Sequence, residues 1–489
     1  MGASDGRIWQ IERNGINAVP ESERKGSVRD VFWIWFGANI AILGVVLGAV
    51  IMSYGLSLWQ GVLVAVLGAL SFALVGVLSI PGARTGVPTL TLARAAFGTY
   101  GNFLPTLLAW LNLVGWEVIV VVTATYALQS ALEAVFGTAS GMALLVVSFV
   151  VVTAVAFGVA LLGHAAIARA QTVFSYVFGA LTVAVYLLLL PKVDWHALLR
   201  MPAGSFTTGV LPALSIVVAG TGLSWVTTSA DYTRYLPRRT AGRAVAGAVT
   251  WGSFLPVFAL MLLGVLLSAA LPKLVTAANP VAVIGAALPA WMSVPYLLCA
   301  VGGLVTADIL DVYSSGLSLL AAGVRIPRYR TILVDAVLSI AGGLYILFVA
   351  QNFIGPFVSF LTLLAGVLAP WAGVFWIDSA RRLAGGGYSL EDLYNGRRSH
   401  YGAVRWQAVL AFLVGVVASL LCTSSPLFTG PFANGIFRGS SIGFVLGLAL
   451  SALLYAVLPE RPRASMVRAE VTAPQAANGQ RRAEGADPE

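Results

Sequence analysis

The sequence contains about twelve stretches of roughly 20 or more mostly apolar residues, separated by short polar segments. Each stretch is long enough to cross ~30 Å of hydrocarbon as an α-helix. Hydrophobic residues make up 58% of the 489 residues, charged residues 10%, and the mean hydropathy is +0.88. A water-soluble protein of this size does not need that much apolar surface. The sequence therefore predicts an all-α integral membrane protein with about twelve transmembrane helices and no soluble catalytic domain.

The expected helices follow one another along nearly the whole chain. We place them at residues 31–54, 59–81, 103–132, 139–162, 166–190, 208–229, 243–271, 290–320, 331–350, 354–378, 404–423 and 440–459. The segment 84–98 is too polar to span, and we expect a short helix at the inner face there. The ends, residues 1–29 and 461–489, hold too few large apolar side chains to fold alone, so we expect disordered tails. The first of them also lacks the apolar core of a cleavable signal peptide.

The formal net charge of +9 raises the question of a nucleic-acid partner. If the N-terminus is cytoplasmic, four of the 29 basic residues fall in or beside outward loops. These four are Lys192, Arg200, Lys273 and Arg438. The others fall on the inner side, which is the positive-inside pattern of membrane proteins and not a basic face interleaved with aromatics. We therefore expect a multi-pass plasma-membrane protein with both termini cytoplasmic and no nucleic-acid partner.

The sequence carries no motif for a cofactor, a nucleotide or a metal cluster. Its histidines, His164, His196 and His400, lie at loops or helix ends, and no Walker A loop occurs. Cys299 and Cys422 lie inside apolar runs, where packing is a better interpretation than a disulfide. We expect no cofactor, no ATP-driven pump and no intramembrane enzyme, and the sequence indicates no oligomeric state.

Three acidic residues lie deep inside expected helices: Glu117, Asp308 and Asp311. An ionisable group at the centre of a membrane helix costs roughly 2.5–3.5 kcal/mol on insertion, so each of these residues is a functional candidate. No lysine or arginine lies deep in an expected helix, and an unpaired carboxylate in a low dielectric tends to hold a proton. Asp231, Asp335 and Asp378 lie nearer the inner ends, where we expect water or arginine to reach them.

Asp308 and Asp311 are three residues apart, about 60° around a helix, so they share a face and feel each other's charge. Such a pair can take up and release a proton as access to water changes, or it can bind N–H groups of a polar ligand. The alternative is that both are protonated and bond a neighbouring backbone carbonyl.

The third expected helix contains NLVGWEV, residues 112–118. The indole of Trp116 offers a flat face for a planar ligand and one N–H donor. Glu117 is turned ~100° from Trp116, so both line one cavity only if that cavity is broad. Packing is the alternative role for Trp116, because the chain has 13 tryptophans.

Glycine and polar residues interrupt the first and sixth expected helices at mid-depth. The first contains WFGANIAILG, with Gly37 and Asn39, and the sixth contains AGTGLSWVTTSADY, with Gly220, Thr221 and Gly222 followed by Ser224. Membrane-helix glycines permit either close packing or an unwound backbone whose amides and carbonyls face a ligand. Both interpretations stay open for each helix.

In order along the chain stand IERNGINAVPESERKG, FWIWFGAN, RTGVPTLTLARAAFG, NLVGWE, SADYTRYLP and DILDVYSSGL. Together these motifs resemble the purine-cytosine permease branch of the nucleobase-cation symporter family. The resemblance implies the fold of the leucine transporter, with two inverted five-helix repeats at 30–192 and 205–380. It further implies a cytoplasmic loop at 381–403 and two accessory helices within 404–460.

The resemblance also implies a central site in which substrate stacks on aromatics of helices three and six and bonds a polar residue of helix eight. The candidate substrate-binding residues are Asn39, Trp116, Glu117, Gly220, Thr221, Gly222, Ser224, Trp225 and Asp311. Related transporters often carry asparagine at the position of Asp311.

For the coupling cation, the resemblance implies a sodium site at Gly37, Ile40, Gly302 and Thr306. This sequence has Val305 where the hydantoin transporter pattern has a second hydroxyl residue, so sodium would lose a ligand. Protons carried by Asp308 and Asp311 are therefore favoured over sodium.

These observations predict a secondary active transporter that imports a nucleobase of the cytosine or purine class by cation symport. The alternatives are a symporter of hydantoin, allantoin or a thiamine-precursor pyrimidine, and a passive channel. A channel needs a continuous polar pore, whereas the deep acids are confined to two helices.

Overall fold

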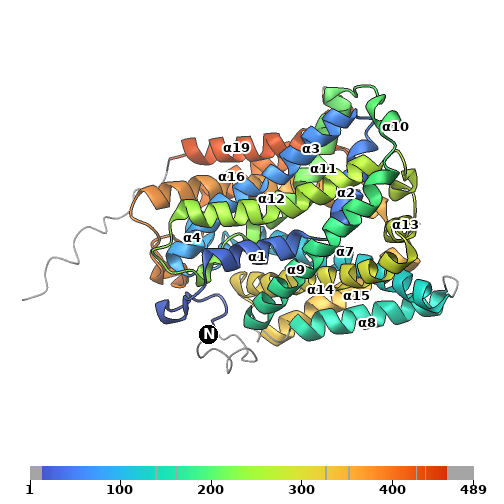
Figure 1. Ribbon diagram of the computed structural model, residues 1–489. Coiled ribbons are helices and arrows are strands. Elements are labelled where there is room, and N and C mark those ends of the chain that lie inside the picture. Colours follow the sequence, from blue (N-terminus) through green and yellow to red (C-terminus); the bar gives the residue numbers. More distant parts are fainter. Residues whose placement is uncertain are drawn as a thin grey trace, which may run out of the picture.

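The computed structural model describes residues 14–137, 141–160, 164–324, 328–350, 353–425, 427–435 and 437–459. In these residues the chain is a bundle of long helices, and no β-strand longer than one isolated bridge, Ser424 with Thr429, occurs. Figure 1 shows the start of α1 and the end of α19 on the left side of the bundle, and α10 and α13 on the right. We call the left end the terminal face and the right end the opposite face.

The helices agree closely with the ranges expected from the apolar runs. The longer ones are α1 (Val28–Asn39), α2 (Leu43–Met52), α3 (Leu58–Leu70), α4 (Phe72–Thr85), α7 (Phe103–Phe136), α8 (Met142–Ala160), α9 (His164–Leu189), α11 (Leu211–Val218), α12 (Gly242–Leu267), α14 (Ala290–Ala321), α15 (Arg328–Phe348), α16 (Ile354–Ala384), α17 (Trp406–Leu421) and α19 (Gly443–Val457). The short ones are α5 (Thr89–Leu92), α6 (Arg94–Phe97), α10 (Trp195–Leu199), α13 (Pro280–Ala287) and α18 (Pro431–Asn434). The helical segment 84–98 is thus confirmed, as α5 and α6.

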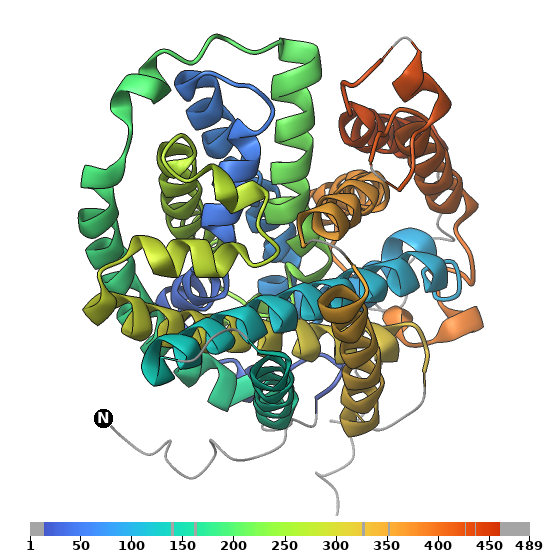
Figure 2. The same ribbon diagram turned by 90° about the vertical axis from the view of Figure 1, so that its right-hand side faces the viewer.

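Seven of the described helices are long and apolar enough to cross a membrane, and the bent pair α1 and α2 makes an eighth. Four shorter apolar helices, Met142–Gly158, Tyr176–Lys192, Trp406–Leu421 and Gly443–Val457, coincide with further expected spans. In Figure 2, viewed from the opposite face, α17 and α19 lie beside α16 at one edge of the molecule. The chain is therefore a multi-pass membrane protein.

Two of the long helices are broken at mid-length, as the glycines suggested. The axes of α1 and α2 differ by 61° across residues 40–42. In the sixth expected span, α11 runs into a π-helical turn at Ala219–Leu223, where Thr221 has the non-helical angles φ −120° and ψ −115°. Short 3-10 turns, Val226–Thr228 and Thr233–Tyr235, complete that span toward the terminal face.

Capping boxes fix where two of these helices begin. The Ser27 hydroxyl accepts a hydrogen bond from the Asp30 N–H (3.1 Å), and the Asp30 carboxylate accepts one from the Ser27 N–H (2.8 Å). Ser57 and Gln60 do the same at the start of α3. Each box satisfies amides that the first helical turn leaves free, which matters most where the helix enters an apolar medium.

Glycines let α2 and α12 touch backbone to backbone beside the first break. A Cβ on Gly48 would lie 2.0 Å from the Met261 carbonyl oxygen, and a Cβ on Gly264 would lie 2.0 Å from that of Val45. Small residues at such crossings replace the hydrophobic effect as the source of helix association in membranes. This contact holds α2, the second half of the first span, against α12.

We predict that Gly264→Ala destabilises the protein, because a methyl group there overpacks the crossing and costs about 1–3 kcal/mol. Heating the detergent-solubilised protein and measuring the monodisperse fraction should show a melting temperature several degrees lower. The matched control is Gly247→Ala on the same helix, where no heavy atom lies within 4 Å of the added Cβ. Equal melting temperatures for the two variants would contradict this interpretation of the crossing.

Candidate functional site

A cavity lies where the two broken helices meet α7, α12 and α14. Most of its lining is apolar, from Ala38, Ala41, Leu43, Gly44, Leu47, Val120, Gly220, Val257, Leu304 and Ala307. Five lining residues carry polar side-chain atoms: Asn39, Trp116, Thr221, Trp225 and Asp311. An apolar chamber with a few convergent polar groups is the usual form of a small-molecule site.

The two tryptophans supply flat apolar surfaces to this cavity. Trp116 is held edge-to-face by Phe357 (centroids 6.2 Å apart) and Phe360 (5.9 Å), both on α16. Trp225 packs edge-to-face on Trp35 of α1 (5.3 Å). The buried Nε1 of Trp116 has no hydrogen-bond partner in the described part of the chain. That N–H is therefore free to donate to a ligand.

Asp311 and Asn39 are the polar groups on the other sides of the chamber. Asp311 lies on α14 and is 4% exposed, so its carboxylate has little contact with solvent. Asn39 ends α1, and its amide donates to the Trp35 carbonyl oxygen (2.9 Å) and to the Ser253 hydroxyl (3.3 Å). The amide oxygen of Asn39 is left to accept a bond from a ligand N–H.

Hydrogen bonds from a neighbouring serine support the break in the sixth span. Ser71, between α3 and α4, accepts the Gly222 N–H (2.9 Å) and bonds the Thr221 hydroxyl (3.0 Å). Only glycine fits at position 222, because a Cβ would lie 2.4 Å from the Ser71 backbone. The Ser224 hydroxyl donates to the Thr221 carbonyl oxygen (2.8 Å). Gly222 and Ser224 thus support the break, and neither is among the residues that line the cavity.

The residues expected for sodium lie on α1 and α14, which contact each other. Gly37 is buried in α1, and Ile40 follows its last residue with non-helical angles. On α14, the Thr306 hydroxyl donates to the Gly303 carbonyl oxygen (2.9 Å), and Gly302 lies one turn earlier. None of the four is among the cavity-lining residues.

Glu117 and Asp308 lie outside the cavity lining and are fully buried. Glu117 faces α15, where the Ser339 hydroxyl donates to its Oε2 (3.0 Å). Neither carboxylate oxygen of Asp308 has a hydrogen-bond partner among the described residues. Trp116 therefore lines the cavity while Glu117 contacts α15, because side chains at adjacent helix positions point ~100° apart.

Asp335 is a buried acid whose surroundings were predicted wrongly from the sequence. We expected water or arginine to reach it, but it is 0% exposed and accepts a hydrogen bond from the Trp110 indole N–H (2.9 Å). Asp335 and Ser339 are four residues apart and share a helix face. This spacing in the sequence could have indicated that both side chains face α7. For Asp378 the expectation is confirmed, because Arg382 donates to its carboxylate (2.6 Å).

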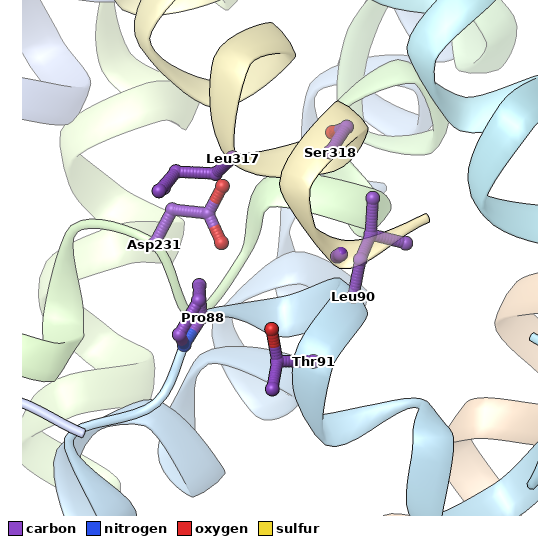
Figure 3. A pocket seen from close by; sticks show the side chains of 7 residues that line it. Pro88, Leu90, Thr91, Asp231, Leu317 and Ser318 are labelled. Carbon is purple, nitrogen blue, oxygen red and sulfur yellow. The ribbon is translucent and has the colours of Figure 1, made fainter. Parts of the chain in front are cut away.

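Asp231 of the sixth span joins the terminal-face segment that follows α4. Its carboxylate accepts bonds from the N–H and the hydroxyl of Thr89, both 2.9 Å. Figure 3 shows this carboxylate between Pro88 and Leu317, at a gap of about 150 Å³. Because both hydrogen bonds come from Thr89, the first residue of α5, Asp231 fixes the end of the broken span to that helix.

Between the cavity and the terminal face, hydrogen bonds tie the broken span to α14. Arg234 donates to the Tyr313 hydroxyl (2.7 Å) and to the Gly15 carbonyl oxygen (2.7 Å). The Tyr232 hydroxyl bonds that of Ser314 (2.9 Å). Burial raises the pKa of the nearby Tyr394 to about 12, so its hydroxyl stays protonated and donates to the Ile16 carbonyl oxygen (2.8 Å). This layer joins the broken span to α14 and to the N-terminal segment.

Comparison with known proteins decides what kind of protein carries this site. Residues 18–447 match the sequence model of a family described as permease for cytosine/purines, uracil, thiamine and allantoin. The chain belongs to this permease family.

Alignments with two relatives cover most of the permease. A Bacillus subtilis (strain 168) protein named "Putative purine-cytosine permease YxlA" is 27% identical over 463 residues, covering 92% of this chain and 96% of its own. The Saccharomyces cerevisiae purine-cytosine permease FCY21 is 24% identical over 481 residues, covering 91% and 85%. The expected family, the purine-cytosine branch of the nucleobase-cation symporters, is confirmed, and the protein is a transporter and not an enzyme.

Solved structures share the fold. Mhp1, a nucleobase-cation-symport-1 family transporter, in a closed conformation with bromovinylhydantoin bound, aligns with a TM-score of 0.69 at 20% identity. The alignment covers 91% of the permease and 94% of Mhp1. An inward-facing conformation of Mhp1 gives a TM-score of 0.66 at 21% identity, covering 91% and 92%. The expected transporter fold is confirmed by these likenesses.

We predict that Ser71→Ala destabilises the broken sixth span, because the buried Gly222 N–H would lose its partner at a cost of about 1–3 kcal/mol. Thermal unfolding in detergent should show a lower melting temperature. The control is Ser53→Ala, whose hydroxyl bonds the Val50 carbonyl at a helix end. An unchanged melting temperature for Ser71→Ala would mean that the break does not need this serine.

Proposed function

We propose that the permease imports a nucleobase of the cytosine or purine class by cation symport. The observation that carries the proposal is the cavity between the two broken helices, which presents two tryptophan faces and one buried carboxylate. A planar base stacks on Trp116 and Trp225 while its ring N–H groups donate to Asp311. The amide of Asn39 accepts or donates a hydrogen bond at another edge of the base. The relatives named as purine-cytosine permeases support this substrate class.

A hydantoin is the second candidate substrate, because Mhp1 with bound bromovinylhydantoin shares the fold. Both rings are planar and carry N–H donors, so the two tryptophans accept either. The carboxylate of Asp311 favours ligands with two adjacent donors, since a carboxylate binds them bidentately. Aminopyrimidines and aminopurines present such an edge when a ring N–H stands beside the amino group.

Transport proceeds by alternating access around this cavity. In our proposal the terminal face is cytoplasmic, which agrees with the concentration of basic residues there, and the layer of Arg234, Tyr313 and Ser314 is the inner gate. The expected inverted repeats, 30–192 and 205–380, then move relative to each other. Cation and base drive the change only because they bind one conformation better than the other.

The coupling ion in our proposal is the proton, bound by Asp308 and Asp311, rather than sodium at Gly37, Ile40, Gly302 and Thr306. The Thr306 hydroxyl already bonds the Gly303 carbonyl oxygen, and Val305 offers no oxygen in its side chain. Asp308, in contrast, is a buried carboxylate without a hydrogen-bond partner in the described residues. Binding of one proton neutralises this carboxylate.

We predict that Asp311→Ala abolishes uptake without preventing insertion and folding. Loss of a hydrogen bond to a charged group costs about 1.5–3 kcal/mol, which is roughly a 10- to 150-fold loss of affinity. The measurement is counterflow of labelled bases in proteoliposomes, with the exposed Asp194→Asn as control. Wild-type counterflow in Asp311→Ala would remove this carboxylate from the substrate site.

Trp116→Ala should weaken binding of cytosine or adenine by about 1–3 kcal/mol, because base stacking on an aromatic side chain contributes that much. Trp116→Phe should recover part of the affinity. Trp59→Ala is the matched control, since that indole is 74% exposed. Binding is measured by scintillation proximity with a panel that includes hydantoin and allantoin. If a hydantoin binds at least tenfold tighter than every base, the second candidate replaces the first.

A further inference from the structure

Three buried carboxylates outside the cavity lining have no role in base recognition. They are Glu117 on α7, Asp308 on α14 and Asp335 on α15. Each is 0% exposed. At roughly 2.5–3.5 kcal/mol per buried acid, packing alone is a poor reason to keep three of them in one place.

Hydrogen bonds and helix packing bring these acids together. Trp110 of α7 donates to Asp335, Ser339 of α15 donates to Glu117, and α14 packs against both helices. Asp308 interacts with the charges of Asp311 and Asp335, and Glu117 interacts with those of Asp335, Asp308 and Asp311. The charged groups that act on Asp308 in the described residues are thus all acidic: one from its own helix and others from α7 and α15. No lysine or arginine is among them.

Asp308 is a fully buried carboxylate with nothing to bond in the described residues. Both of its oxygens are without a hydrogen-bond partner in the described part of the chain, as are Oε1 of Glu117 and Oδ2 of Asp335. An ionised carboxylate buried in this way would lack solvation, a counter-ion and a donor. A bound ligand must therefore neutralise it.

The ligand that fits is a proton and not a metal ion. A metal ion needs several oxygen or nitrogen ligands that converge on one point. Among the described residues, no group of three or more His, Cys, Asp or Glu side chains has that arrangement. A proton needs one carboxyl oxygen and can move between neighbouring groups.

The acids also lie at different depths. Helices α7 and α15 both begin at the terminal face, and Asp335 is seven residues into α15 while Glu117 is fourteen into α7. At ~1.5 Å per residue, these positions are ~10 Å and ~21 Å along their helices. Ser339, which donates to Glu117, lies between them in depth, one turn beyond Asp335. Asp311 is in the cavity wall, one turn from Asp308.

We propose that Glu117, Asp308 and Asp335 form a proton site and exit route that is separate from the base-binding cavity. Asp308 receives the coupling proton from Asp311 at the cavity wall. Glu117, Ser339 and Asp335 lead it to the terminal face. Each carboxyl that passes the proton on is left ionised, while Ser339 takes up the proton from Glu117 and gives its own hydroxyl proton to Asp335, so that it ends neutral. The site therefore holds one proton more when loaded than when empty. The inference rests on the proposed symport of a base.

The test compares two kinds of transport in the same proteoliposomes: accumulation of labelled base driven by a pH gradient, and counterflow without a gradient. Glu117→Gln and Asp335→Asn should each reduce driven accumulation at least tenfold while counterflow stays within about twofold of wild type, and Asp308→Asn should reduce driven accumulation by at least as much. Counterflow should also lose its pH dependence in Asp308→Asn. Glu391→Gln, an exposed acid far from these helices in the sequence, is the control for a change of charge.

Wild-type protein gives an independent measurement that needs no variant to fold. A pH-sensitive dye inside the vesicles should report one proton entering with each base. The inference is overturned if no proton accompanies the base, if sodium alone drives accumulation, or if Glu117→Gln and Asp335→Asn accumulate base as wild type does. The proposed function fails separately, if wild-type protein shows no counterflow with any base.

Discussion

The structure depends on one constraint: inside a membrane, every backbone N–H and carbonyl must find a partner within the protein. Two helices nevertheless break at mid-depth, at residues 40–42 and at Thr221. At the second break, Ser71, which lies between α3 and α4, accepts the freed Gly222 N–H. The side-chain hydroxyl replaces the helical carbonyl, and the chain can turn its polar atoms toward a central cavity. The cavity that we propose as the substrate site lies at these breaks, and the second break is satisfied from the neighbouring α3–α4 segment.

The buried acids fall into two physical groups. Near the terminal face, Asp378 is neutralised by Arg382 and bonded by Tyr455, and Asp231 accepts two bonds from Thr89. These satisfied carboxylates join segments that are far apart in the sequence. At mid-depth, Asp308 has no such partners among the described residues. A paired carboxylate stabilises the fold, whereas an unpaired one is suited to bind a proton. A carboxylate that must bind and release a proton cannot already be neutralised by a fixed partner.

In the proposed transport cycle, the layer of Arg234, Tyr232 and Tyr394 must hold one conformation and still be able to open. Its bonds from Arg234, Tyr232 and Tyr394 are each expected to contribute about 0.5–1.5 kcal/mol net. Their sum is a few kcal/mol, which is the range that a ligand with different affinities for two states can overcome. A fixed layer of ion pairs would resist opening far more strongly.

The sequence by itself determined the helices, because an apolar run of membrane length has no other stable form. Its glycines and polar residues marked where the two breaks lie, with close packing as the alternative, and the family resemblance placed Trp116, Trp225, Thr221 and Asp311 together among the candidate site residues. What only the tertiary structure decided is which helix each side chain faces. Adjacent positions on α7 send Trp116 to the cavity and Glu117 to α15, and Asp335 is buried because α7 covers it with Trp110. Periodicity gives the angle between side chains on one helix, but the neighbour at each angle is set by the packing of helices far apart in the chain.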